Sequence, residues 1–173
     1  MTAPILAPFP WFGGKSSVAG DVWQRFGDVK NFVEPFFGSG ACLLARPKHQ
    51  GFETINDFDG LLANAWRALQ VDPEAVACHA DWPVSECDLH ARHSWLVGAR
   101  ESITARLMGD AEYFDAKAAG WWLWGISSWI GSGWCSGEGP WMVNDDGRLR
   151  PFFPHPRRDR RDPGPLPLVA DGG

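Results

Sequence analysis

The sequence predicts an α/β fold with parallel strands, followed by a helical region. Residues 31–41 begin as a mostly apolar run, which suits a strand, and then turn through Gly38 and Gly40 into good helix formers. A second strand is predicted over 52–57 and a helix over 58–70. Because two consecutive strand–helix pairs are joined by right-handed crossovers, the two strands are expected to be parallel.

Composition narrows the class of protein. The chain has 173 residues, enough for one domain with a core, and its formal net charge of −5 argues against a uniformly basic nucleic-acid-binding surface while leaving a local basic groove open. It contains no apolar span of membrane length and no signal-peptide pattern. The four cysteines fit no disulfide framework, so free thiols in a reducing cytoplasm are expected. Eleven tryptophans must be buried, stacked on a ligand or exposed for interaction.

A glycine turn and a helix are expected before the first strand. The segment 11–15 reads as a compact turn that ends in the cation of Lys15. A helix is predicted over 17–26, with Ser16 as its N-cap and Gly27 as its end. Helical spacing predicts the buried face of this helix as Val18, Val22 and Phe26.

The second half of the chain changes character. Asp72 is expected to cap a short helix, and longer helices are predicted over 87–108 and 111–130. A loop rich in glycine and tryptophan follows over 131–141, and the proline- and arginine-rich tail is expected to be disordered. The predicted divisions are an α/β cofactor-binding unit at 1–71, a helical region at 72–150 and the tail at 151–173.

Three features of the α/β unit point to a cofactor. Lys15 lies on a glycine turn, the Gly38/Gly40 turn ends the first strand, and Asp57 ends the second. An acid about 20 residues beyond the glycine turn is where dinucleotide folds bind ribose hydroxyls. Asp57 would accept hydrogen bonds from a ribose, Lys15 would pair with a carboxylate, and the glycines would admit the cofactor. S-adenosylmethionine has all of these parts.

Three motifs stand out, namely the segments 10–15 (PWFGGK), 34–40 (EPFFGSG) and 56–59 (NDFD). In sequence and in order they resemble the motifs of a known family, the alpha-class N6-adenine DNA methyltransferases of phages and bacteria. The resemblance implies an incomplete Rossmann-like S-adenosylmethionine-dependent methyltransferase fold, with the helices as an inserted target-recognition region. It also implies S-adenosylmethionine as methyl donor, adenine in double-stranded DNA as acceptor, and the cytoplasm of a bacterial or phage-infected cell as location.

The resemblance and the spacing together nominate a cofactor site. The expected cofactor-binding residues are Trp11, Lys15, Glu34, Pro35, Phe36, Gly38, Gly40 and Asp57. Alternatives stay open for four of them: Trp11 as core, Lys15 as a solvated surface cation, Glu34 as a satisfied buried acid, and Asp57 as a helix N-cap. No metal site is expected, because the cysteines and histidines between 78 and 93 lack the paired spacing of zinc ligands.

The family's catalytic motif, an Asp-Pro-Pro-Tyr-type tetrapeptide, does not occur in this sequence. Asp162 to Pro165 lacks both the second proline and the aromatic residue. We therefore expect no catalytic residue and a chain truncated before the catalytic half. The alternatives are a non-catalytic remnant that binds cofactor or DNA, and a dinucleotide-binding oxidoreductase module, against which the third glycine of its fingerprint is missing. Trp121, Trp122, Trp124 and Trp129 suit either base stacking or, more simply, a core.

Overall fold

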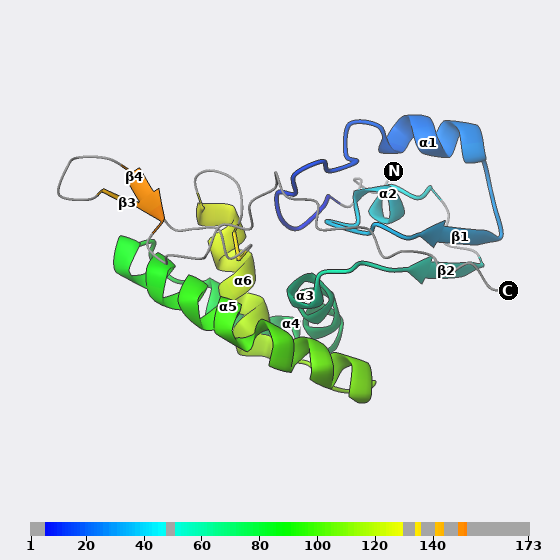
Figure 1. Ribbon diagram of the computed structural model, residues 1–173. Helices are drawn as coiled ribbons and strands as arrows, with labels where there is room; N and C mark the ends of the chain where they lie inside the picture. Colours follow the sequence, from blue (N-terminus) through cyan, green and yellow to red (C-terminus); the bar gives the residue numbers. More distant parts are fainter. Residues whose placement is uncertain (1–5, 48–50, 130–133, 136–140, 144–148, 152–173) are drawn as a thin grey trace, which may run out of the picture. The chain divides into compact units, whose positions relative to one another are not determined.

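The computed structural model describes residues 6–47, 51–129, 134–135, 141–143 and 149–151, the last two segments as backbone only. The chain divides into two compact units, residues 1–137 and residues 138–173. The first unit contains eight described elements (Figure 1): α1 (Ala19–Phe26), β1 (Asn31–Glu34), α2 (Ala41–Leu44), β2 (Phe52–Ile55), α3 (Gly60–Val71), α4 (Pro73–Ala80), α5 (Glu86–Gly109) and α6 (Ala116–Ser128). The second contains β3 (Trp141–Val143) and β4 (Leu149–Pro151), an antiparallel pair that the sequence did not predict.

Strands β1 and β2 pair in parallel, as predicted, with Asn31 opposite Phe52 and Glu34 opposite Ile55. The combination of helices with a small parallel sheet is consistent with an α/β methyltransferase-like fold. β1 is buried on one face only, because Phe32 and Glu34 are inside whereas Val33 is 63% exposed. β2 is exposed along its whole length. Its exposure reflects the size of this sheet, which has two strands among the described residues.

The first helix differs from the prediction. α1 begins at Ala19 after Val18, and no side chain caps it, so the prediction of Ser16 as N-cap is wrong. Its buried residues are Ala19 and Trp23, whereas Val18 and Phe26 are about half exposed. Gly27 ends the helix with a positive φ of 64°, as predicted.

A small core joins α1 to the first strand and to α2. Trp23 packs against Phe32 with ring centroids 4.8 Å apart, and its indole Nε1 donates to the carbonyl of Cys42 at 2.7 Å. The guanidinium of Arg46 lies over the Trp23 ring and is hydrogen-bonded to Glu53 at 2.8 Å. A single indole therefore sets which face of α1 is buried, since its polar edge also needs a partner.

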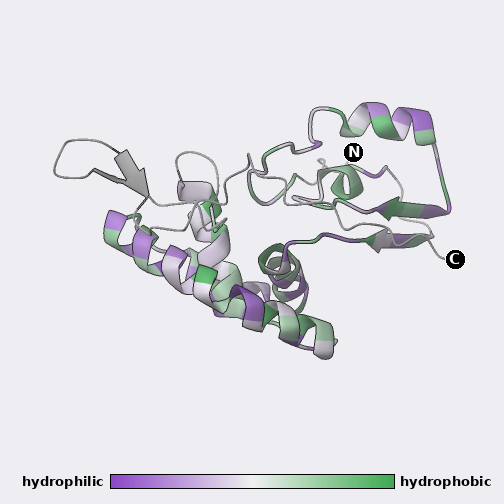
Figure 2. Ribbon diagram, in the orientation of Figure 1, coloured by the Kyte–Doolittle hydropathy of each residue, from purple (hydrophilic) through white to green (hydrophobic). Residues whose placement is uncertain are grey.

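The larger core lies among α3, α4, α5 and α6. α3 contributes Leu61, Leu62 and Ala65, all at most 1% exposed. Trp122 and Trp124 of α6 are buried, which confirms the core interpretation for these two tryptophans, while Trp121 and Trp129 are partly buried. α5 carries hydrophilic and hydrophobic bands along its length (Figure 2), and its buried residues include the polar Arg92 and His93 as well as Leu96, Ile103 and Leu107.

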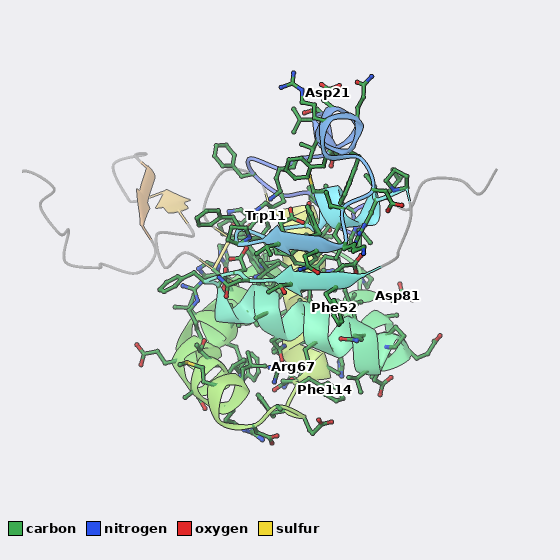
Figure 3. All side chains as sticks on the ribbon, turned by 90° about the vertical axis from the view of Figure 1, so that its right-hand side faces the viewer. Trp11, Asp21, Phe52, Arg67, Asp81 and Phe114 are labelled. Atoms are coloured by element: carbon green, nitrogen blue, oxygen red, sulfur yellow. The ribbon has the colours of Figure 1, made fainter. Side chains whose placement is uncertain are left out.

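Capping side chains set the helix boundaries in this region. Asp72 caps α4 as predicted, and Ser85 and Asp115 cap α5 and α6. The predicted start of the last helix at 111 is therefore too early, because Asp115 fixes the start at Ala116. Arg67 of α3, labelled in Figure 3, ties down the α5–α6 connection by donating to the carbonyls of Asp110 and Tyr113 at 2.9 and 2.8 Å.

Several predictions concern residues outside the described ones. Most of the loop predicted over 131–141, and the tail at 152–173, lie outside the described residues.

None of the described helices is both long and apolar enough to span a membrane. The four cysteines are free, in agreement with the absence of a disulfide framework.

Asp59 provides a first test of the fold. Its carboxylate accepts a hydrogen bond from Leu61 N at 2.9 Å and caps α3. We expect Asp59→Ala to lower the free energy of unfolding by about 1 kcal/mol, as loss of an N-cap usually does. Urea denaturation measures this loss. The conservative variant Asp59→Asn should retain most of the stability, and an equal loss in both variants would contradict a capping role.

Candidate functional site

The carboxyl ends of β1 and β2 are tied together by backbone hydrogen bonds. Asn56 N donates to Glu34 O at 3.0 Å, and Phe37 N donates to Asn56 O at 2.9 Å. The side-chain amide of Asn56 adds a bond to Pro35 O at 3.2 Å. In open α/β sheets ligands bind at the carboxyl ends of parallel strands, so this junction is the place to look for a site.

Asp57 is bonded to the glycine turn. Its Oδ2 accepts from Gly38 N at 2.9 Å, and its Oδ1 accepts from Asp59 N at 3.2 Å. The cap of α3 is Asp59, so the alternative of Asp57 as the N-cap is wrong. Each carboxylate oxygen has capacity for a further hydrogen bond, and the side chain is half-buried rather than enclosed.

Lys15 and Glu34 meet at the start of the same turn. Lys15 Nζ lies 3.0 Å from Glu34 Oε1 and also donates a hydrogen bond to the carbonyl of Phe36. The side chain of Glu34 is 6% exposed, and neither of its oxygens accepts a well-formed hydrogen bond from the described residues. A buried carboxylate with one neighbouring cation and unused acceptor capacity favours a donor group brought by a ligand.

Trp11 packs directly on the glycine turn. Gly38 has a φ of 56°, and a Cβ added there would lie 2.6 Å from Trp11 Nε1, so only glycine fits beneath the ring. Trp11, labelled in Figure 3, also contacts Phe9 and Trp122, with ring centroids 6.2 and 6.0 Å away. Trp11 therefore belongs to the core, as one of the two interpretations expected, and it also packs on the glycine turn. Its contact with a cofactor stays a prediction.

The remaining nominated residues complete the turn. Gly40 has a φ of 68° and lies against the ring of Phe37, which leaves no room for a side chain. The Nε1 of Trp66 in α3 donates a hydrogen bond to Gly38 O at 2.9 Å, which fixes the turn to α3. Pro35 and Phe36 are exposed beside it. The structure thus brings all eight nominated residues to one junction, although what each binds is a prediction.

A thiol lies beneath this junction. Cys42, in the first turn of α2, is buried. Burial, and then the carboxylate of Glu34, raise the pKa of the Cys42 thiol, while Lys15 acts in the opposite direction. A raised pKa favours the neutral thiol, which packs as a small apolar group. Among the described residues no group of histidines, cysteines or carboxylates forms a metal site.

Sequence reasoning nominated Phe36 but missed two further exposed aromatic residues near the junction, Phe12 and Phe58. Phe12 and Phe58 are fully exposed, and Phe36 is 80% exposed. Phe12 lies on the first glycine turn, whereas Phe36 and Phe58 follow the ends of the two strands. For Phe58 the sequence contained a signal, because this large apolar residue directly follows Asp57, the acid predicted to end the second strand. A residue at that position is expected at the surface rather than in the core. Such rings suit contact with a planar heterocycle.

These features form a strand–glycine turn–helix junction in an α/β unit, and in other α/β proteins nucleotide-like cofactors bind at junctions of this kind. Residues 11–82 match the family model of the D12 class N6 adenine-specific DNA methyltransferases. The match confirms the predicted resemblance of the N-terminal part of the chain to such an enzyme, and it supports DNA adenine methylation at the level of the family. No curated protein and no solved structure matches the chain.

Proposed function

We propose that this chain binds S-adenosylmethionine at the junction of β1 and β2, as the cofactor-holding part of a DNA adenine methyltransferase of Rossmann-like fold. The observation that carries the proposal is the Lys15–Glu34 pair beside the glycine turn, with Nζ and Oε1 3.0 Å apart. A cation and a carboxylate side by side are complementary to the zwitterionic amino-acid end of this cofactor.

Lys15 and Glu34 would each bind one charged group at the amino-acid end of the cofactor. The ammonium of Lys15 has three donors, one of which goes to Phe36 O, so another is available for a carboxylate. The acceptor capacity of Glu34 would take the ligand's ammonium and relieve the cost of a buried carboxylate. Asp57 would accept from the ribose hydroxyls while its bonds to the turn hold it in place.

Calorimetric titration with S-adenosylmethionine and with NAD tests this function. NAD carries ribose hydroxyls but no amino-acid zwitterion, so we expect S-adenosylmethionine to bind and NAD to bind weakly or not at all. Adenosine alone and methionine alone separate the two halves of the site. Binding of NAD without binding of S-adenosylmethionine would favour the oxidoreductase alternative and refute the proposal.

Methyl transfer is expected to be absent from the chain alone. Adenine N6 is a weak nucleophile because its lone pair is delocalised into the ring, so its amino group must be held and aimed at the methyl carbon. The groups at the junction would hold the donor, and the Asp-Pro-Pro-Tyr-type motif that holds the acceptor in the family does not occur in the sequence. The chain by itself is therefore expected to bind the cofactor without transferring its methyl group.

Transfer of tritiated methyl groups to unmethylated duplex DNA measures this, with an intact enzyme of the D12 class as positive control. The chain is expected to give no more than background counts under conditions in which it binds cofactor. Turnover comparable to the control would show that another segment replaces the tetrapeptide.

A further inference from the structure

A hollow of about 400 Å³ opens on the surface, lined mainly by α4, α6 and the connection between α4 and α5. We call it the Trp82 hollow. None of its lining residues carries a charge, and it shares no residue with the candidate cofactor site. Most of the lining side chains are apolar, among them Pro8, Pro73, Leu123 and Trp124.

Trp82 presents a restrained aromatic ring to this hollow. The residue is 56% exposed, and its carbonyl accepts a hydrogen bond from Trp124 Nε1 at 2.7 Å, which fixes its backbone. The guanidinium carbon of Arg92 lies 5.7 Å from the centroid of its ring, a contact that also restrains the side chain. An exposed and restrained indole offers a flat apolar face to a binding partner at little cost in side-chain entropy.

Three of the four polar side chains that line the hollow already donate hydrogen bonds. Trp124 Nε1 donates to Trp82 O, Ser127 Oγ to Leu123 O at 3.0 Å, and Ser128 Oγ to Trp124 O at 2.8 Å. The fourth donor, Trp82 Nε1, has no acceptor among the described residues. The hollow therefore suits an occupant that brings hydrogen-bond acceptors and few donors of its own.

The chain around the hollow is acidic. Residues 68–91, which run from the end of α3 into α5, include five acids and no lysine or arginine. Glu74 and Asp81 are exposed and are the neighbours in sequence of the lining residues Pro73 and Ala80. Neither carboxylate forms an ion pair within the described part of the chain. This charge favours an occupant with a basic flank.

A proline-rich segment next to basic residues meets all of these requirements. Proline has a carbonyl acceptor but no N–H donor, and its fixed φ lowers the entropy lost on binding. Aromatic-lined grooves bind proline-rich segments in several families of recognition domains. This chain contains such a segment at 157–168 (RRDRRDPGPLPL), outside the described residues, with four arginines followed by three prolines.

We infer that two copies of this chain associate through that segment. The prolines of one copy occupy the Trp82 hollow of the other, and the arginines lie beside the acids around the hollow. Each copy carries one hollow and one segment, so the association depends on protein concentration. The inference concerns self-association, and it holds or fails independently of the proposed cofactor.

Sedimentation velocity of the full chain over a wide range of concentrations tests the inference. The average mass should rise with protein concentration and fall with added salt, because salt screens the charges. Trp82→Leu should weaken association by about tenfold or more. Trp82→Phe keeps a ring but loses the donor, and should weaken association by about threefold. Trp95→Leu is the matched control, because Trp95 is 38% exposed but does not line the hollow, and it should associate like wild type.

A second variant approaches the contact from the other side and keeps the test valid if Trp82→Leu fails to fold. Replacement of Pro163, Pro165 and Pro167 by serine changes the segment alone and should weaken association as much as Trp82→Leu does. Neither variant should associate with itself, but a mixture of the two should, because one supplies the segment and the other the hollow. A wild-type chain that stays monomeric, association that neither change weakens, or a mixture that stays monomeric would each overturn the inference.

Discussion

Replacing Gly38 with alanine is expected to lower the free energy of unfolding by about 2–5 kcal/mol and to abolish cofactor binding. Two effects add at this position. The residue has a φ of 56°, which strains any residue with a Cβ, and the new methyl group would lie 2.6 Å from Trp11 Nε1 and 2.7 Å from its Cδ1. Relief of that contact requires the indole to leave the turn, so the ligand-facing surface changes together with stability. Urea denaturation and titration with S-adenosylmethionine measure the two effects.

Gly27 provides the matched control. It has a φ of 64°, close to that of Gly38, but a Cβ added there would meet nothing within 4 Å. Gly27→Ala therefore carries the backbone strain alone, about 1–3 kcal/mol, because its φ of 64° and ψ of −148° lie in a region that only glycine adopts readily. The difference between the two alanine variants isolates the contact with Trp11, and the double variant with Trp11→Ala should recover part of the loss at Gly38. Equal losses at the two glycines would mean that Trp11 does not constrain the turn.

Local chemistry in the sequence predicted the parts of the fold that depend on single residues. The positive φ of Gly27, the cap at Asp72 and the parallel pairing of the two strands all follow from short-range rules. The buried face of α1 did not follow from its periodicity. The predicted buried face begins at Val18, whereas the observed buried face begins at Ala19. A shift of one residue rotates the buried face of an α-helix by about 100°.

Contacts with the rest of the fold determine which face of α1 is buried. The ring of Trp23 packs against Phe32, and its Nε1 donates to Cys42 O. Neither partner can be located from the sequence of the helix. The candidate site shows the same division. Sequence nominated Lys15 and Glu34 separately, but their mutual contact depends on how the first glycine turn folds back over β1. The contact of the Arg92 guanidinium with the Trp121 ring could not be predicted from the sequence either, because it arises from the packing of α5 against α6.

Asp57→Ala is expected to weaken S-adenosylmethionine binding by about 1–3 kcal/mol, equal to about 5- to 150-fold in Kd. The carboxylate holds Gly38 N and Asp59 N, and in the proposed function it also accepts from the ribose hydroxyls. Its removal leaves those donors unsatisfied and frees the glycine turn from the end of β2. Calorimetry, at a temperature well below unfolding, measures the loss of affinity.

Asp59→Ala is the control that separates binding from capping, because it removes a neighbouring carboxylate whose bond goes to the helix at Leu61 N. We expect Asp59→Ala to reduce stability while leaving cofactor affinity near the wild-type value. Asp57→Ala should lower the cofactor affinity, and it should also lower stability because it leaves the N–H groups of Gly38 and Asp59 without an acceptor. Asp57→Asn refines the comparison, since the amide keeps one acceptor but presents a donor where the carboxylate accepted the second backbone N–H. Its affinity should fall between those of wild type and Asp57→Ala. If Asp57→Ala loses stability but keeps the Kd of wild type, the carboxylate only shapes the turn, and the ribose contact belongs to another residue.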